Sequence, residues 1–395
     1  MPVQQLKISN MAKKKSKKKN IALIVFTVLL IVGVLAGGGY LVYRKIADPY
    51  TAYEVDYTEK LVANAATFYV PYSDGYMRVS RDGAEAVNSL GLRIWNVSYS
   101  MNGPLCDVNG NYAVIGDTDG RVIYITDGTG TVKQIEVSYA ISEVECAQNG
   151  VAAVRMHDGE SDYIRLVSFD GETLAEIKTT EAEHGYPLDI DLSQDGKRLV
   201  TSYLVIDGET AGGCITFYNF GDVGQNYTNR MTGVFKYGKM SPKIDFIDKN
   251  SICAFFDDGI KIYSCPEVPS LTAEITASDQ ILCADARDGV IVLMESGKQN
   301  NTVSHTFAYN NAGKCIFEST SNDNLDGVMI FGKSFLFYND YACQILRRDN
   351  SVRYNGNFGE RKIKQFISVN GKDKLLLFEE DSVSTMRLVK SGKTK

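Results

Sequence analysis

Turn dipeptides recur along this chain at a spacing that leaves few folds open. Asn-Gly and Asp-Gly pairs between apolar runs indicate hairpins, because tight hairpin turns need positive φ angles at both central residues. A second series of such pairs follows the first by about ten residues, and a third follows in some units. Three turns in a unit of about 43 residues predict four short antiparallel strands per unit. The first series consists of Asn109-Gly110, Asn149-Gly150, Asp195-Gly196, Lys249-Asn250, Asp288-Gly289, Asp326-Gly327 and Asn370-Gly371.

Repeated units of this length and strand content are typical of β-propellers, in which four-stranded blades pack radially around an axis. The clearest unit has predicted strands at Leu105–Val108, Tyr112–Gly116, Val122–Thr126 and Val132–Val137. Its middle strands are apolar at nearly every position, as expected of strands buried between neighbouring blades. We therefore predict an all-β propeller from residue 53 to residue 395, with two stacked sandwiches as the alternative.

The two ends of this region predict how the ring closes. Counting back one period places a first unit at Leu61–Leu90, whereas the last unit, Ile363–Val389, shows only three strands. The segment Tyr53–Tyr57 is left over and is expected to supply the missing strand. The prediction is eight blades, or seven if the first unit is degenerate.

Residues 21–43, ahead of the repeats, contain no charged residue. A bilayer core takes about 20 apolar residues as a helix, so this segment is predicted to be a single transmembrane α-helix. A cleaved signal peptide is the alternative, although the apolar run exceeds the usual signal core. A lipoprotein anchor is excluded because no Cys follows Leu35-Ala36-Gly37. The residues predicted to span the membrane include Ile21, Leu23, Val25, Phe26, Leu29, Leu30, Ile31, Val34, Leu35, Leu41 and Tyr43.

A lysine run before the apolar segment predicts its orientation. Cytoplasmic flanks of membrane helices are enriched in Lys and Arg, and only Arg44 and Lys45 follow the segment. We therefore expect a cytoplasmic tail (1–20), a span (21–43), a linker (44–52) and an extracytoplasmic propeller (53–395). Translation from Met11 would shorten the tail. The lysines of the topology signal are Lys13, Lys14, Lys15, Lys17, Lys18 and Lys19.

Charge is distributed unevenly along the chain. Residues 1–45 contain no acidic residue, whereas the remainder carries 33 basic and 48 acidic residues. An acidic propeller argues against nucleic acid as a partner, because binding it requires a basic surface.

The eight cysteines all lie in the repeat region. Outside the cytoplasm an even number suggests disulfides, but these cysteines sit singly in apolar runs, as in Ile252-Cys253-Ala254. Buried Cys behaves as a small hydrophobe, so we expect mostly free, buried thiols.

A search for catalytic, metal-binding or cofactor-binding patterns gives no candidate. His157, His184 and His305 fall in different units without ligand spacing. The run Gly233–Met240 imitates a phosphate loop but lacks the Ser or Thr that holds magnesium, and a strand is expected after it. Asp-rich stretches lack the calcium-loop pattern and are explained by turn chemistry. The sequence therefore predicts no catalytic residue, no metal ligand and no cofactor.

The segment Ser193-Gln194-Asp195-Gly196-Lys197-Arg198-Leu199-Val200 resembles a hairpin motif of bacterial propellers with WD40-like and quinoprotein-like repeats. The chain is not a standard WD40 protein, since Trp95 is its only tryptophan. The full layout resembles an uncharacterised bacterial family of membrane-anchored propellers, a likeness that implies a fold but no activity.

These observations favour a non-catalytic binding or scaffold propeller outside the plasma membrane, whose partner is a protein, a peptide or a cell-envelope polymer. An extracytoplasmic hydrolase, lyase or quinone-dependent enzyme with its site in the central channel is the alternative. A sensor that signals through the lysine-rich tail is a third hypothesis. The channel-lining side chains discriminate between the first two.

Overall fold

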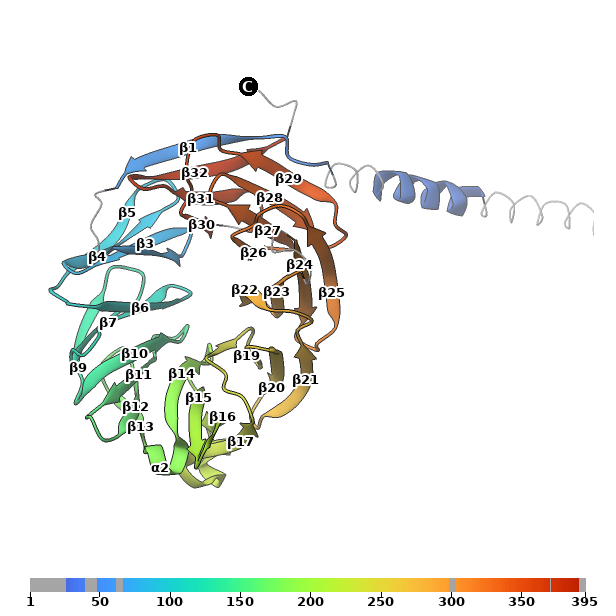
Figure 1. Cartoon of the computed structure of the whole chain (residues 1–395). Coiled ribbons are helices and arrows are strands. Elements are labelled where there is room, and N and C mark those ends of the chain that lie inside the picture. Colours follow the sequence, from blue (N-terminus) through green and yellow to red (C-terminus); the bar gives the residue numbers. More distant parts are fainter. Residues whose placement is uncertain (1–25, 40–47, 62–66, 298–302, 370, 391–395) are drawn as a thin grey trace, which may run out of the picture. The chain divides into compact units, whose positions relative to one another are not determined.

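The computed structural model describes residues 26–39, 48–61, 67–297, 303–369 and 371–390. The chain divides into two units, Met1–Pro49 and Tyr50–Lys395. The first contains a helix over residues 26–39. The second is a β-propeller, in which the described residues form eight four-stranded antiparallel sheets around a central axis (Figure 1). The predicted all-β propeller of eight blades is confirmed, and stacked sandwiches are excluded.

Each blade runs from an inner strand at the axis to an outer strand at the rim, and blades 1–8 are numbered in chain order. The inner strands are β2 (Phe68–Tyr72), β6 (Pro104–Asn109), β10 (Ala140–Cys146), β14 (Tyr186–Leu192), β18 (Lys243–Phe246), β22 (Ile281–Arg287), β26 (Gly327–Phe331) and β30 (Gln365–Ser368). The second strands are β3 (Gly75–Ser80), β7 (Tyr112–Asp117), β11 (Ala152–His157), β15 (Arg198–Asp207), β19 (Ser251–Phe256), β23 (Val290–Ser296), β27 (Ser334–Asn339) and β31 (Lys374–Phe378).

The third and outer strands complete the blades. The third strands are β4 (Gly83–Asn88), β8 (Val122–Thr126), β12 (Asp162–Val167), β16 (Thr210–Asn219), β20 (Gly259–Ser264), β24 (Ser304–Asn310), β28 (Ala342–Arg347) and β32 (Ser382–Val389). The outer strands are β5 (Arg93–Ser98), β9 (Val132–Glu136), β13 (Thr173–Thr179), β17 (Met231–Tyr237), β21 (Ser270–Thr276), β25 (Cys315–Ser321), β29 (Val352–Asn357) and β1 (Ala52–Lys60). Short helices α2 (Glu181–His184), η1 (Val223–Asn226) and η2 (Thr228–Arg230) flank blade 4.

The ring is closed by the first strand of the chain. Strand β1 pairs with β32 in antiparallel register from Ala52↔Val389 to Lys60↔Ser382. Across this pair, Arg387 Nε lies 3.1 Å from Asp56 Oδ1. The prediction that Tyr53–Tyr57 completes the last blade is confirmed.

Removing the closing strand tests its contribution to stability. Deletion of residues 52–60 exposes the edge of β32, and we expect the midpoint of thermal unfolding to fall by more than about 5 °C. The control, Glu54→Gln with Asp56→Asn, keeps the strand and removes exposed ion pairs, which contribute little, so its midpoint should stay close to that of the parent. An unchanged midpoint in the deletion variant would contradict this account of closure.

The hydrophobic core is divided among the interfaces between blades. Because successive side chains of a strand point to opposite faces of the sheet, the middle strands present apolar residues to both neighbouring blades. Between blades 2 and 3, for example, buried Val114 and Ile125 pack with Val144 and Val154. Polar contacts supplement this packing: Tyr72 Oη of blade 1 donates to the Asn111 carbonyl oxygen of blade 2 at 2.8 Å.

The segment Ser193–Val200 forms the predicted hairpin, between β14 and β15. Gly196 adopts a φ of +69°, which favours glycine, and Ser193 Oγ donates to Asp195 Oδ1 at 2.6 Å. The motif also joins two blades through Arg198, which is only 4% exposed. Its guanidinium donates to the amide oxygen of Asn250 (2.9 Å) and to the backbone oxygens of Lys249 (3.0 Å), Pro266 (3.1 Å) and Cys265 in blade 5.

Substituting Arg198 measures this connection. Arg198→Ala leaves several oxygens of blade 5 without their donor, and we expect the free energy of unfolding to fall by more than about 2 kcal/mol. Denaturant unfolding provides the measurement. The exposed neighbour offers a matched control, since Lys197→Ala should change stability by less than about 0.5 kcal/mol. Equal effects of the two substitutions would show that the connection contributes little.

One dipeptide of the predicted first turn series does not connect the inner and second strands of its blade. Asp326-Gly327 stands at the start of β26, and the first hairpin of blade 7 turns at Gly332, with a φ of +60°. Gly327 is required for space rather than for a turn, because a Cβ there would meet the Tyr338 hydroxyl at 2.5 Å.

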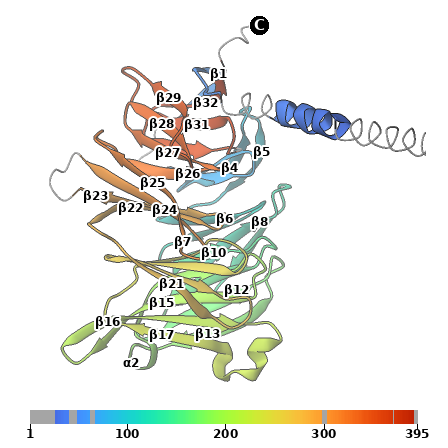
Figure 2. The same cartoon turned by 90° about the vertical axis from the view of Figure 1, so that its right-hand side faces the viewer.

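The turns divide between the two faces of the ring. The turns from inner to second strands and from third to outer strands share one face, and the turns from second to third strands share the other. Tyr50 enters the propeller on the former face, where its N–H donates to the Arg353 carbonyl at 2.7 Å beside the end of β32. We call this the exit face and the opposite one the far face. Figure 2 shows the β15–β16 hairpin extending on the far face.

Candidate functional site

Acidic side chains follow the inner strands of blades 2–6 around the central axis. The residues on these strands alternate between facing the preceding and the following blade, and the acidic ones face the following blade. We call this set the carboxylate arc. It comprises Asp107 on β6, Glu143 and Glu145 on β10, Asp189 and Asp191 on β14, Asp245 on β18 and Asp285 on β22.

Carboxylates of the arc accept backbone hydrogen bonds from the next inner strand. The N–H of Cys146 donates to Asp107 Oδ2 at 2.7 Å, and the N–H of Ile244 donates to Asp189 Oδ2 at 2.7 Å. The N–H of Ile330 donates to Asp285 Oδ2 at 2.7 Å, and Asp191 accepts from Phe246 in the same way. An inner strand is the edge of its sheet, and its unpaired N–H groups need acceptors. The arc thus joins neighbouring blades at the axis.

Cations compensate part of this negative charge. Lys243 Nζ lies 3.0 Å from Asp245 Oδ1 and 3.4 Å from Asp189 Oδ2. Arg155 Nε donates to Glu143 Oε2 at 2.7 Å. The Lys243 pairs link blades 4 and 5, and the Arg155 pair lies within blade 3, where the same guanidinium also donates to the Pro187 carbonyl oxygen of blade 4 at 3.1 Å.

Burial dominates the protonation of the arc. Desolvation raises the pKa of Asp107, Glu145 and Asp191 above their ordinary range. Desolvation likewise raises the pKa of Asp189 to about 7, against the opposing effect of Lys243. Burial disfavours the ammonium of Lys243, but the carboxylates of Asp245 and Asp189 outweigh it and raise its pKa.

The arc predicts an unusual dependence of stability on pH. A carboxyl whose pKa is higher in the folded than in the unfolded state binds more protons when folded, so its contribution to stability decreases as pH rises through the window between the two values. For Asp189 that window runs from about pH 4 to about pH 7. We expect a lower midpoint of thermal unfolding at pH 8 than at pH 5.5, and a smaller difference in Asp189→Asn. The exposed Asp170→Asn is the control; a parent protein more stable at pH 8 would contradict the prediction.

The arc lacks the geometry of a metal centre. No group of three His, Cys, Asp or Glu side chains within the described residues is placed to hold a metal ion. Sequence reasoning missed the arc, although a signal was present. Each of these inner strands carries an acidic residue three to five positions before the second residue of its turn pair, as Asp107 does before Gly110 and Asp191 before Gly196.

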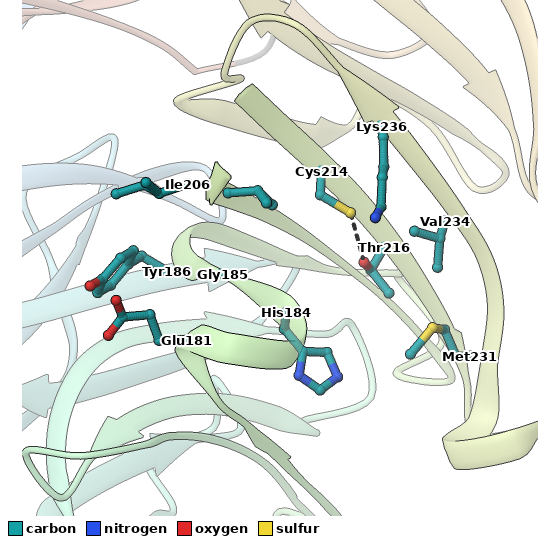
Figure 3. Close-up of a pocket in the computed structure, with 11 residues that line it drawn as sticks. Glu181, His184, Gly185, Tyr186, Ile206, Cys214, Thr216, Met231, Val234 and Lys236 are labelled. Atoms are coloured by element: carbon teal, nitrogen blue, oxygen red, sulfur yellow. Dashed lines mark hydrogen bonds between the residues drawn. The ribbon is translucent and has the colours of Figure 1, made fainter. Parts of the chain in front are cut away.

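Blade 4 carries the second feature, a hollow between its strands and the segment that contains α2 (Figure 3). This hollow, called the α2 hollow here, has a volume of about 430 Å³. A neighbouring hollow of about 520 Å³ shares His184 and Met231 with it and extends along β13. The α2 hollow is lined by Glu181, His184, Gly185, Tyr186, Val205, Ile206, Cys214, Thr216, Met231, Val234 and Lys236.

The lining of the α2 hollow suits binding better than covalent chemistry. Cys214 Sγ lies 3.7 Å from Thr216 Oγ1, and burial raises the pKa of this thiol, which keeps it protonated and weakly nucleophilic at neutral pH. In contrast, Ile206 is 58% exposed and Tyr186 is 40% exposed at the mouth. Strands β15 and β16 each extend over ten residues, and Val205, Ile206, Cys214 and Thr216 on these strands line the hollow.

The histidines and cysteines occupy scattered positions. His157 ends β11 with its Nε2 3.4 Å from Asp119 Oδ1, and His305 lies in the third strand of blade 6. His184 lies in α2. All eight cysteines are free thiols in the structure, and five of them are buried. The run Gly233–Met240, which resembles a phosphate loop in sequence, lies on strand β17 and the loop after it.

The predicted membrane segment is described only in part. Phe26, Leu29, Leu30, Ile31, Val34 and Leu35 lie on the helix over residues 26–39. No helix among the described residues combines the length and the apolar character that crossing a bilayer requires, so the predicted span is not confirmed. The remaining predicted residues, Ile21, Leu23, Val25, Leu41, Tyr43, Lys13, Lys14, Lys15, Lys17, Lys18 and Lys19, lie outside the described residues.

Residues 45–388 match the model of a family of unknown function, DUF5711. The chain belongs to this family. No curated protein matches the sequence significantly. The family match covers all eight blades, so the regular ring and its carboxylate arc both lie within the DUF5711 region.

Solved structures resemble the propeller in fold. A crystal structure of the eukaryotic initiation factor has a TM-score of 0.53 at 11% identity, covering 80% of this chain and 83% of that one. The Pan2 WD40 domain of Neurospora crassa has a TM-score of 0.43 at 10% identity, covering 74% of this chain and 89% of that one. At 11% identity, the likeness to the initiation factor shows the fold alone.

Proposed function

We propose that this DUF5711 propeller is a non-catalytic binding or scaffold module for a protein, peptide or cell-envelope ligand. One observation carries the proposal: five of the seven carboxylates of the arc accept hydrogen bonds from the backbone of the next blade. They are Asp107, Glu143, Asp189, Asp191 and Asp285. Their oxygens hold the ring together, which leaves the rim and the turn faces as surfaces for partners. The α2 hollow supplies a concave, partly apolar surface of this kind.

An enzyme with a site in the central channel is the second candidate. It is favoured by Asp189, whose pKa of about 7 suits a general acid or base. Against it, Asp189 Oδ2 already accepts the Ile244 N–H and lies near Lys243 Nζ. These contacts give the carboxylate a structural role, so we favour the binding module.

The proposal includes a setting outside the cytoplasmic membrane of a bacterium, with a single N-terminal anchor. Its support is the uncharged segment 21–43 and the lysine run before it. Such a run directs the N-terminus to the cytoplasm, which would display the propeller on the outside.

Membrane attachment is tested by fractionation. We expect the full chain to sediment with membranes and to remain there after a high-salt wash, because apolar insertion is insensitive to ionic strength. Leu29→Lys with Leu30→Lys introduces two charges, each costing about 3 kcal/mol at the centre of a span, and should release the protein. Leu29→Val with Leu30→Val is the matched control. A parent chain found in the supernatant would refute the anchor.

A further inference from the structure

The turns of the far face concentrate negative charge. The described residues of the turns between second and third strands include eleven acidic and only two basic residues, Arg81 and Arg121. The connections between blades lie on the same face and add further charges of both signs, so the face as a whole keeps a net negative charge. The basic residues of these connections are Lys239, Arg361, Lys362 and Lys364, and the acidic ones include Glu181, Asp279, Asp323, Asp326 and Glu360. Acidic residues occur in the turns between second and third strands in seven of the eight blades. They are Asp82, Asp119, Asp158, Glu160, Glu209, Asp257, Asp258, Asp340, Glu379, Glu380 and Asp381.

On the exit face, the numbers of acidic and basic residues are closer to each other. Its turns, in the part of the chain that the structure describes, contain eleven acidic and seven basic residues. The negative charge of the propeller is therefore polarised toward one face, a pattern that turn chemistry alone does not require.

An apolar feature lies at the same end of blade 4. The α2 hollow opens beside Ile206, which directly precedes Asp207 at the far-face end of β15. Ile206 and Tyr186 are exposed at its mouth (Figure 3). Asp207 and Glu209 are exposed in the same hairpin, and Glu160 in blade 3 and Asp257 in blade 5 are exposed in the adjacent turns. Lys236 also lines the hollow, and Lys239 Nζ lies 3.5 Å from Asp257 Oδ1. The rim of the hollow is therefore predominantly, but not wholly, anionic.

We infer that the far face around blades 3–5 is the partner-binding face, and that it takes a cationic polypeptide segment which inserts an apolar side chain into the α2 hollow. This inference deepens the proposed binding function and rests on it. The carboxylates of the rim attract the basic residues of the partner and speed its association. The hollow, about the size of a small ligand pocket, adds specificity for an apolar side chain between those basic residues.

The test uses the full chain reconstituted in nanodiscs of zwitterionic lipid. Two fluorescent probes are compared at low salt: an oligolysine peptide with a central Leu-Leu pair, and the all-lysine peptide of equal charge. We expect the parent to bind the leucine-containing peptide more tightly, and salt to weaken both peptides because exposed charges are screened. Neutralising the rim with Glu160→Gln, Asp207→Asn, Glu209→Gln and Asp257→Asn should weaken binding roughly tenfold.

Matched variants distinguish binding at the far face from attraction to the overall negative charge of the propeller. Asp170→Asn, Glu172→Gln, Asp222→Asn and Asp288→Asn remove the same charge from the exit face and should leave affinity within about twofold. Ile206→Ser should abolish the preference for the leucine-containing peptide, whereas Val268→Ser, on an exit-face turn, should keep it. Equal weakening by both charge variants, or no binding by the parent, would overturn the inference. Stronger weakening by the exit-face variant would refute the face assignment and leave the binding function standing.

Discussion

Each blade of this propeller can bury its apolar faces only against its neighbours. A four-stranded sheet with apolar residues on both sides has no core of its own, so every interface in the ring depends on the next one. The pairing of β1 with β32 supplies the last interface and brings together residues more than 320 positions apart. Forming such non-local contacts costs chain entropy before the packing free energy of the interface compensates for it. The stability of the ring therefore depends on the meeting of its two ends.

The same radial geometry explains the carboxylate arc. Blades converge at the axis, where each inner strand presents a free edge and little room remains for apolar side chains. A carboxylate that faces the following blade satisfies one of these free N–H groups, as Asp107 does for Cys146 and Asp285 for Ile330. The arc covers blades 2–6. On the inner strand of blade 7, Met329 instead packs against the apolar core it shares with blade 8. Most acidic residues of the arc are thus explained by hydrogen bonding between blades, whereas most of those in the far-face turns are exposed to solvent.

Much of the fold could be predicted because a propeller repeats a local pattern. Turn pairs and apolar runs located most of the strands, including the segment Tyr53–Tyr57 that closes the ring. The predicted turn series was wrong at Asp326-Gly327. Gly327 does not form a turn there; it leaves space for the Tyr338 side chain. Periodicity does not distinguish these two reasons for a glycine, because the second depends on a side chain in the neighbouring strand.

The sequence by itself determined the all-β class, the four-stranded unit, the number of units and the strand that closes the ring, since hairpin turns and alternating burial are local properties written in consecutive residues. Only the tertiary structure decided which acidic residues meet at the axis, that Arg198 joins blades 4 and 5, and that the hollow beside α2 opens within a predominantly anionic rim. These features join residues from different blades, and their contacts depend on how the sheets are rotated about a common axis.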